Sequence, residues 1–313
     1  MKRKTRTEKT RNGTSSRTRR NHSPGTHAST RSTTAGRRTI IIGDLHGDPE
    51  ALAAILEHAR LATSGAWTGG AARLIQLGDC VDRGPDSVGV LDLLATVQQS
   101  AAAGGGEVVR LAGNHEMELM RGCVNYAQNL PDPLRVGERL CREVAAGQII
   151  CAARVGAWLC LHGGLRPELR HQLAREAQSR GHGTGLTGVV ERMNDLFARA
   201  AKDGDFGHAL FDDRRGAFWT YREELLRAPG ALEVPQIVGH TVCPSPFIAG
   251  HRALFADQGI SVAMWNRPSY LEFDGPRLRW HVRGSDGVWR TETRDAAPGS
   301  LHVDRRPAWS SVA

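Results

Sequence analysis

The chain lacks both a long hydrophobic run and a dense set of cysteines. No segment reaches the roughly 18 consecutive apolar residues that a membrane-spanning helix needs, so we expect no membrane span. The six cysteines include no Cys-x-x-Cys pair. Isolated cysteines are typical of reduced, mostly buried thiols in an intracellular protein. These absences predict a cytoplasmic chain that is not held together by disulfides.

Acidic residues are almost absent from residues 1–38. This segment holds 12 of the 41 Lys and Arg residues but only one of the 33 acidic residues, and it has almost no large apolar side chain. Such a composition cannot bury enough apolar surface to offset the entropy lost on ordering. We therefore expect a disordered basic tail, which could contact an anionic partner weakly. The remaining residues carry a net charge of −3, so the high pI belongs to the tail.

From residue 39 onward, short apolar runs alternate with amphipathic stretches. Leu52, Ile55, Leu56 and Ala59 recur at helical spacing, and Asp48 precedes a proline as a helix N-cap would. The alternation indicates an α/β fold. We expect one folded domain over residues 39–293 and a flexible C-terminal tail over residues 294–313. The runs that we interpret as buried strands are residues 39–42, 74–77, 108–111, 149–152, 158–161, 237–238, 252–255, 270–273 and 278–282.

Five short glycine-containing strings follow these predicted strands in a fixed order. Because ligands gather at the carboxyl ends of strands in α/β proteins, we expect all five strings to build one site. A single Asp-x-His would be weak support for a metal site, but five strand ends with polar side chains are not typical of a core or a random surface. The strings are Gly43–Gly47, Gly78–Gly84, Gly113–Glu116, Leu161–Gly164 and Gly239–Thr241.

The side chains in these strings suit metal ions and phosphate. Carboxylate and amide oxygens together with imidazole nitrogens favour paired divalent or trivalent first-row metals. Two such metals a few ångströms apart indicate hydrolysis of a phosphate ester. The candidate residues are the carboxylates Asp44, Asp79 and Asp82, the imidazoles His46, His115, His162 and His240, the amide Asn114 and the guanidinium of Arg83.

The strings resemble the signatures of the PPP family of metallophosphatases: GDxHG, GDxxDRG, GNHE, HGG and a later GH. The resemblance spans roughly residues 39–282. Residues 82–86, 219–222, 238–241 and 257–261 are most similar to the bacterial, Shewanella-like branch. The resemblance implies the metallophosphoesterase fold, a sandwich of two central mixed β-sheets flanked by helices.

The same resemblance implies two metal ions, with manganese expected and iron or zinc also suited. One ion would be held by Asp44, His46 and Asp79. The second would be held by Asp79 and by Asn114, His162 and His240. The bridging Asp79 would offset the repulsion between the two cations, and a hydroxide shared by them would attack phosphorus in line.

The family also implies roles for the other residues in the strings. His115 would be the general acid for the leaving oxygen, and Asp82 would orient its ring. Arg83 and Asn114 would bind the substrate phosphate. Arg222 is our candidate for a second phosphate-binding arginine, although this chain has one residue more than the usual Trp-x-Arg spacing, which leaves its neighbours Arg214 and Arg215 as alternatives. Glu116 is expected to support the backbone rather than bind metal.

The predicted function is hydrolysis of phosphomonoesters by a protein phosphatase that acts on phosphoserine and phosphothreonine or on phosphotyrosine. An alternative is a dinucleotide polyphosphate hydrolase of the diadenosine tetraphosphatase kind, which shares the early motifs, although residues 219–222 argue against it. A third hypothesis is a non-catalytic protein that binds phosphate or an anionic surface. It ranks lowest because all the expected metal ligands are present, and so are the two residues expected to act in catalysis, Asp82 and His115.

Overall fold

A computed structural model describes residues 37–125, 127, 129–247 and 252–296. Residues 1–36 of the predicted basic tail and residues 297–313 of the predicted C-terminal tail lie outside this part. Arg37 and Arg38, which close the predicted basic tail, pair with the carboxylates of Glu107 and Glu272. None of the described helices combines the length and the apolar composition needed to cross a lipid bilayer.

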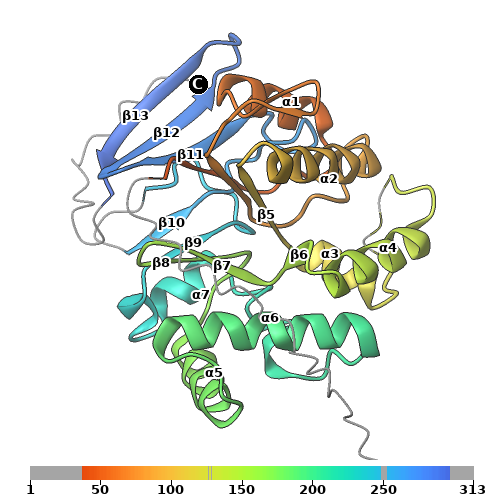
Figure 1. The fold of residues 1–313 in the computed structure, drawn as a ribbon, viewed down its shortest axis with the longest axis vertical. Helices are drawn as coiled ribbons and strands as arrows, with labels where there is room; N and C mark the ends of the chain where they lie inside the picture. The colour runs from red at the N-terminus through yellow and green to blue at the C-terminus, as the bar shows by residue number, and fades with distance from the viewer. Residues whose placement is uncertain (1–36, 126, 128, 248–251, 297–313) are drawn as a thin grey trace, which may run out of the picture. The chain divides into compact units, whose positions relative to one another are not determined.

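The larger sheet combines parallel and antiparallel strands in the order β13-β12-β11-β1-β4-β5-β6 (Figure 1). Neighbouring strands run parallel from β1 to β6, whereas β11, β12 and β13 form an antiparallel meander that adds to β1. Its strands are β1 (Thr39–Ile42), β4 (Arg73–Gln76), β5 (Glu107–Leu111), β6 (Ile149–Ile150), β11 (Ser269–Asp274), β12 (Arg277–Arg283) and β13 (Trp289–Asp295).

The smaller sheet has the order β10-β9-β8-β7 and is also mixed, because β7 is antiparallel to β8 while β8, β9 and β10 are parallel. A separate two-stranded hairpin, β2 (Ala62–Thr63) and β3 (Ala66–Trp67), follows the first helix. The strands of the smaller sheet are β7 (Ala152–Val155), β8 (Trp158–Leu161), β9 (Gln236–Val238) and β10 (Ala253–Phe255).

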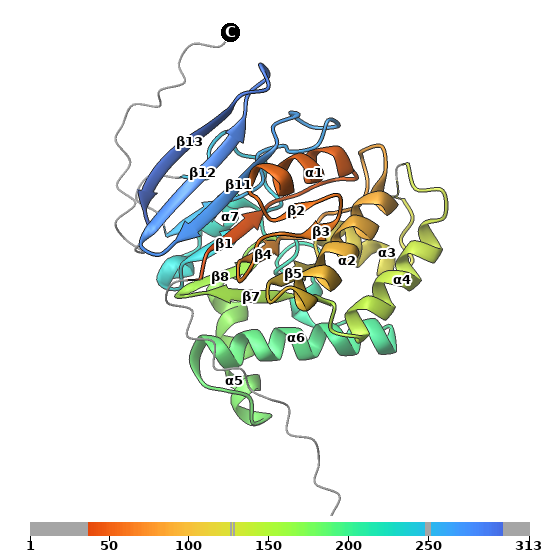
Figure 2. The same cartoon turned by 45° about the horizontal axis from the view of Figure 1, so that its top comes forward.

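Helices cover the outer face of each sheet (Figures 1 and 2). In Figure 2, α1 and α2 lie on the larger sheet, while α5 and α6 lie below the smaller one. The helix α1 starts as predicted, because the Asp48 carboxylate accepts a hydrogen bond from the Ala51 N–H. The helices are α1 (Pro49–His58), α2 (Ser87–Ala103), α3 (Asn114–Met120), α4 (Pro133–Ala145), α5 (Pro167–Ser179), α6 (Gly185–Asp203), α7 (Arg222–Arg227) and the 3-10 turns η1 (Ala209–Phe211) and η2 (Ala231–Glu233).

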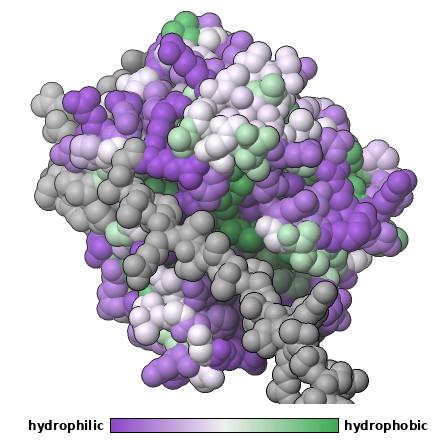
Figure 3. Space-filling model, in the orientation of Figure 1, coloured by the Kyte–Doolittle hydropathy of each residue, from purple (hydrophilic) through white to green (hydrophobic). Residues whose placement is uncertain are grey.

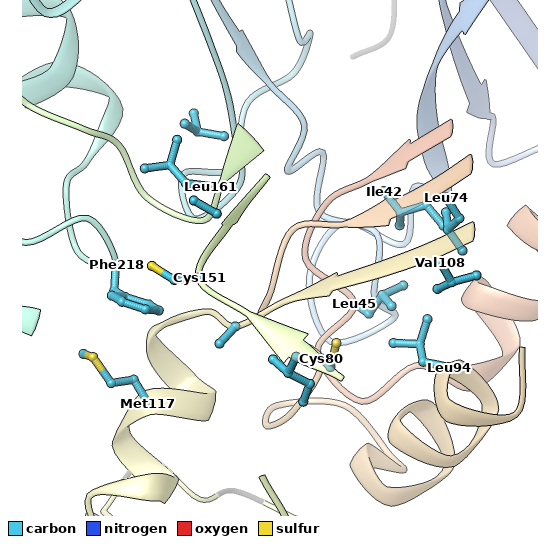
Figure 4. Packing of buried hydrophobic residues seen from close by; sticks show 14 of the residues in the cluster. Ile42, Leu45, Leu74, Cys80, Leu94, Val108, Met117, Cys151, Leu161 and Phe218 are labelled. Carbon is cyan, nitrogen blue, oxygen red and sulfur yellow. The ribbon is translucent and has the colours of Figure 1, made fainter. Parts of the chain in front are cut away.

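The side chains of each central strand alternate between two apolar layers. Ile41 belongs to a cluster between the sheets that also contains Ile237 and Leu254 of the smaller sheet. Ile40 and Ile42 belong to the cluster that the helices cover. Figure 4 shows this second cluster, in which residues of β1, β4 and β5 lie beside Leu94 of α2. The predicted α/β sandwich of two mixed sheets flanked by helices is therefore confirmed.

Two local predictions differ from the structure. The predicted strand over residues 149–152 is split between the two sheets, because the Cys151 and Ala152 N–H groups both donate to the Asn194 side-chain oxygen. The strand β13 was not predicted, since its sequence is polar and lacks an apolar run. It reaches Asp295 and thus extends two residues into the predicted C-terminal tail.

Figure 3 shows the face of the molecule seen in Figure 1. Hydrophilic side chains cover much of this face, and hydrophobic ones are visible between them near its middle.

Candidate metal centre and active site

The five predicted strings meet where the strands of both sheets end. Asp44, Asp79 and Asn114 follow the parallel strands β1, β4 and β5, and His162 and His240 follow β8 and β9. Because parallel strands end at the same edge of a sheet, each sheet presents its polar residues on one side. The structure thus brings together side chains that are almost 200 residues apart in the sequence.

Tight backbone turns place these side chains. His46, Asp79 and His240 have φ angles of 40°, 52° and 63°, a region that non-glycine residues rarely occupy. The neighbouring glycines are needed for space as well. A Cβ atom on Gly239 would lie 2.3 Å from Asp44 Oδ1, and one on Gly113 would lie 2.1 Å from Asp79 Oδ1. Glycine therefore allows the backbone to approach the carboxylates closely.

One group of donor atoms consists of Asp79, His162 and His240, whose candidate ligand atoms lie within 4.8 Å of one another. His162 Nδ1 hydrogen-bonds with the Leu77 carbonyl oxygen at 3.0 Å, which orients Nε2 toward Asp79 Oδ2 at 3.4 Å. Asn114 Oδ1 lies 2.9 Å from the same Nε2. His240 Nε2 is buried without a hydrogen-bond partner in the structure, as a nitrogen available to a metal would be.

A second group surrounds His46 on the other side of Asp79. His46 Nδ1 hydrogen-bonds with the Val81 carbonyl at 3.1 Å, and His46 Nε2 lies 3.8 Å from Asp79 Oδ2 and 4.0 Å from Asp44 Oδ2. His115 also belongs to this group, since its Nε2 is 3.8 Å from Asp79 Oδ2. Asp79 is thus the residue that both groups share.

Two buried carboxylates lie within this centre, and their pKa values move in opposite directions. Burial raises the pKa of Asp44 well above its usual range, and the nearby charges of Asp257 and Asp79 add to this effect. Burial also opposes ionisation of Asp79, but the charges of His162 and His115 outweigh it and hold that pKa well below its usual range. A cation bound between the carboxylates would favour the ionised form of both. The donor set, its burial and the available His240 nitrogen all fit two metal ions.

His115 and Asp82 form a buried pair beside Asp79. His115 Nδ1 donates to Asp82 Oδ2 at 2.7 Å, so Nε2 is the ring nitrogen directed at Arg83 and Asp79. Burial disfavours the charged ring, but the Asp79 charge and the hydrogen bond to Asp82 outweigh it and raise the pKa of His115. The pair therefore has both the orientation and the electrostatic support of an acid–base histidine.

A cavity of about 340 Å³ opens over these groups. Arg83 projects along its wall, with Nη1 2.8 Å from His46 Nε2 and Nη2 3.3 Å from His115 Nε2. A guanidinium at this position can donate two parallel hydrogen bonds to an anion in the cavity. The residues that line the cavity are Asp79, Arg83, Asn114, His115, Trp219, Tyr221 and His240.

Arg222, the candidate for the second phosphate-binding arginine, is not among the residues that line this cavity. Its guanidinium pairs with the Glu223 carboxylate and donates to the Cys243 sulfur at 3.2 Å. Its backbone N–H donates to the Thr241 hydroxyl at 3.1 Å. The side chain thus lies next to the string that contains His240, but its guanidinium contacts Glu223 and Cys243 and does not line the cavity. A phosphate-binding role for Arg222 stays a prediction.

Glu116 lies beneath the site as the predicted backbone support. One carboxylate oxygen accepts hydrogen bonds from the N–H groups of Cys80 and Val81, and the other accepts from Asp79 and Gly113. This single buried side chain therefore holds two of the metal-binding loops together. The sequence position after His115 was the signal that pointed to it.

Asp257 lies near Asp44, and no role for it is predicted from the sequence. It is buried, its Oδ1 accepts from the Gly259 N–H at 2.9 Å, and its carbonyl accepts from the Cys243 N–H. Burial raises its pKa to about 6 despite the Gly259 hydrogen bond. Residues 257–261 enter the sequence prediction only through the family resemblance, because the approach of Asp257 to Asp44 depends on strand order and not on a local pattern.

Comparison with known proteins identifies the family. Residues 37–244 match the calcineurin-like phosphoesterase family, so the chain belongs to that family. The predicted enzyme class, a metal-dependent phosphatase, is confirmed at the level of this family.

Two curated relatives fall in the branch that the motifs indicated. The chain is 37% identical over 90 residues to Shewanella-like protein phosphatase 2 of Arabidopsis thaliana and 37% identical over 90 residues to Shewanella-like protein phosphatase 1 of Plasmodium berghei. These matches cover 28% of this chain in both cases and only 23% and 25% of the relatives, so the chain aligns with about a quarter of their length.

The fold is also similar to that of a solved structure, the cold-active protein-tyrosine phosphatase of a psychrophilic Shewanella species. The two share a TM-score of 0.62 at 21% identity, over 82% of this chain and 80% of the other. At this identity the likeness supports the fold.

Proposed function

We propose that this chain is a protein phosphatase that hydrolyses phosphomonoesters of serine and threonine or of tyrosine side chains. The observation that carries the proposal is the buried His115–Asp82 pair, which faces the same cavity as Arg83 and lies beside Asp79, the carboxylate that both groups of candidate ligand atoms contain. The two Shewanella-like relatives are named as protein phosphatases, which supports the same substrate class.

Six residues of the predicted strings would hold two metal ions. Asp44, His46 and Asp79 would bind one ion, and Asp79, Asn114, His162 and His240 the other. When bound, such ions polarise a phosphoryl oxygen and lower the pKa of water, so that a nucleophile exists near neutral pH. We propose manganese as the metal; iron and zinc suit the same donors.

His115 would supply the proton that the leaving oxygen needs. Because Nδ1 donates to Asp82, Nε2 is the nitrogen that carries the proton toward the substrate when the ring is charged. Asp82 keeps the ring in this orientation, and the two nearby carboxylates favour the charged form.

Arg83 and Asn114 would bind the phosphoryl oxygens. The Arg83 guanidinium lies between His46 and His115. A phosphate bound by this guanidinium would therefore lie beside the proton donor His115. Arg222 would join them only if its side chain left Glu223 and Cys243, which would need a rotation of its side-chain torsions.

A panel of substrates tests this proposal. We expect Mn²⁺-loaded protein to release phosphate from phosphoserine, phosphothreonine or phosphotyrosine peptides. Diadenosine tetraphosphate should be a poor substrate in the same assay. Turnover of the dinucleotide without turnover of any peptide would overturn the protein phosphatase proposal.

Variants then test the assigned roles. His115→Asn and Asp82→Asn should lower kcat by about 10²–10⁴-fold while bound metal stays unchanged, because neither residue is assigned to a metal. Asp79→Asn should lower both turnover and metal content. Loss of metal in all three variants would show that His115 and Asp82 were assigned wrongly.

A further inference from the structure

An uncharged segment with three large apolar side chains lies next to Arg83, which lines the catalytic cavity. Residues 261–266 form turns between β10 and β11, and in Figures 1 and 2 this blue connection passes near α1. The Val262 and Trp265 side chains are 55% and 49% exposed, and Met264 is half-buried. We refer to Val262, Met264 and Trp265 as the apolar ridge.

The turns that display the apolar ridge are fixed to the metal-binding loop. The Ser261 hydroxyl donates to the His46 carbonyl oxygen at 3.1 Å, and the Val262 N–H donates to Asp48 Oδ2 at 2.8 Å. Within the turns, the Met264 N–H donates to the Ser261 carbonyl at 2.9 Å. The ridge is therefore held in place before any ligand arrives, which lowers the entropy lost on binding.

The apolar ridge is continuous with the cavity through Arg83. Arg83 Nη1 lies 3.8 Å from the Met264 sulfur, and the same guanidinium lines the cavity beside His115. A group attached to a phosphate held by Arg83 therefore leaves the cavity within reach of the ridge. One residue of an extended chain spans roughly 3.5 Å, which is similar to the 3.8 Å between Arg83 Nη1 and the Met264 sulfur.

The ridge offers apolar contact and no charge. Covering large apolar side chains that are exposed to water lowers the free energy of the system. Exposed apolar patches commonly mark binding sites. Met and Trp can also adapt to partners of different shape. Such a surface suits an aliphatic or aromatic side chain, and the ridge itself offers no cation to the charged linker of a dinucleotide polyphosphate.

We propose that the apolar ridge binds an apolar side chain next to the phosphorylated residue of a polypeptide substrate. This inference rests on the proposed protein phosphatase function and adds a preference for apolar residues beside the phosphorylated one.

Two matched phosphopeptides test the inference. Both contain the phosphorylated residue that the protein hydrolyses fastest, flanked on each side by two leucines in one peptide and by two serines in the other. For the unaltered protein we expect kcat/KM about tenfold higher for the leucine peptide, mainly through KM, which corresponds to about 1.4 kcal/mol.

Substitutions in the ridge should remove this preference. In Trp265→Ala and in Val262→Ser, the ratio of kcat/KM for the leucine peptide to that for p-nitrophenyl phosphate should fall several-fold. Val288→Ser is the control, because Val288 is 54% exposed in the turn between β12 and β13 and makes no contact with Arg83 among the interactions of the described residues. That variant should keep the full preference.

The outcomes separate this inference from the proposed function. Equal rates on both peptides, or a preference that survives both ridge substitutions, would overturn the inference while the phosphatase function stands. An equal fall on peptide and p-nitrophenyl phosphate would also overturn it, since the ridge would then support the catalytic centre instead of binding substrate. A loss of dinucleotide turnover alone would assign the ridge to a nucleobase and refute a peptide partner. No release from any phosphopeptide would refute the proposed function itself.

Discussion

Replacing Glu116 with glutamine changes one atom of a buried carboxylate that holds the metal-binding loops together. In the structure, Oε1 accepts the N–H groups of Cys80 and Val81, and Oε2 accepts those of Asp79 and Gly113. In the Glu116→Gln variant, one of these oxygens becomes an NH₂ group, which cannot accept a hydrogen bond. Two backbone donors therefore lose their partner while the shape of the side chain stays almost the same.

The size of the effect follows from the number of bonds lost. A hydrogen bond to a charged group contributes about 1.5–3 kcal/mol, so two of them amount to about 3–6 kcal/mol. A domain has about 5–15 kcal/mol of total stability, so this is a large fraction. The Glu116→Ala truncation would leave all four N–H groups without an acceptor. It is a less informative variant, because it could prevent folding altogether.

Urea unfolding monitored by tryptophan fluorescence measures this change. We expect the free energy of unfolding of Glu116→Gln to fall by about 3–6 kcal/mol. Glu57→Gln is the matched control, since Glu57 is exposed on α1 and the same substitution there should change stability by less than about 0.5 kcal/mol. A change of under about 1 kcal/mol at Glu116 would refute the role assigned to its carboxylate.

Three further predictions concern other parts of the chain. Gly239→Ala should weaken Mn²⁺ binding roughly 10- to 100-fold in calorimetric titration, because the new Cβ would collide with Asp44; unchanged affinity would contradict this. Hydrogen bonds from His281 and Arg38 lower the pKa of Glu272 to about 2 from 4.5, so its ionised form stabilises the fold above pH 4.5 and this stabilisation is lost as the pH falls toward 2. The stability difference between the unaltered protein and Glu272→Gln should therefore shrink by about 2 kcal/mol between pH 7 and pH 3, and a constant difference would refute the assignment. Deletion of residues 1–36 should leave turnover of p-nitrophenyl phosphate unchanged, and a large fall would show that the basic segment takes part in catalysis.

Much of the fold could be predicted because its central strands are continuous apolar runs. The predicted strands over residues 39–42 and 158–161 agree with β1 and β8 residue for residue. The strand β13 could not be found in this way, since only one of its faces packs and its sequence is polar. The break between β6 and β7 depends on Asn194, more than 40 residues away, which no local pattern reveals.

In the candidate site, too, local patterns could be predicted and features that depend on distant residues could not. The residues in the five strings could be predicted because each string combines a glycine-permitted turn with a polar side chain at a strand end. In the structure, candidate ligand atoms form two groups that share Asp79, and one of these groups contains His115, which was not predicted as a ligand. The orientation of Arg222 could not be predicted, because it depends on a choice between Glu223, Cys243 and the cavity. The proximity of Asp257 to Asp44 likewise arises from strand order.

The most direct test of the central claim is phosphate release from a phosphopeptide as a function of added Mn²⁺, after all bound metal has been removed with a chelator. We expect no turnover in the chelated protein and recovery as Mn²⁺ is restored, with the Asp79→Asn variant recovering little. Full turnover in the presence of chelator, or no phosphate release at any metal concentration, would contradict the proposal that these residues form a metal-dependent phosphatase.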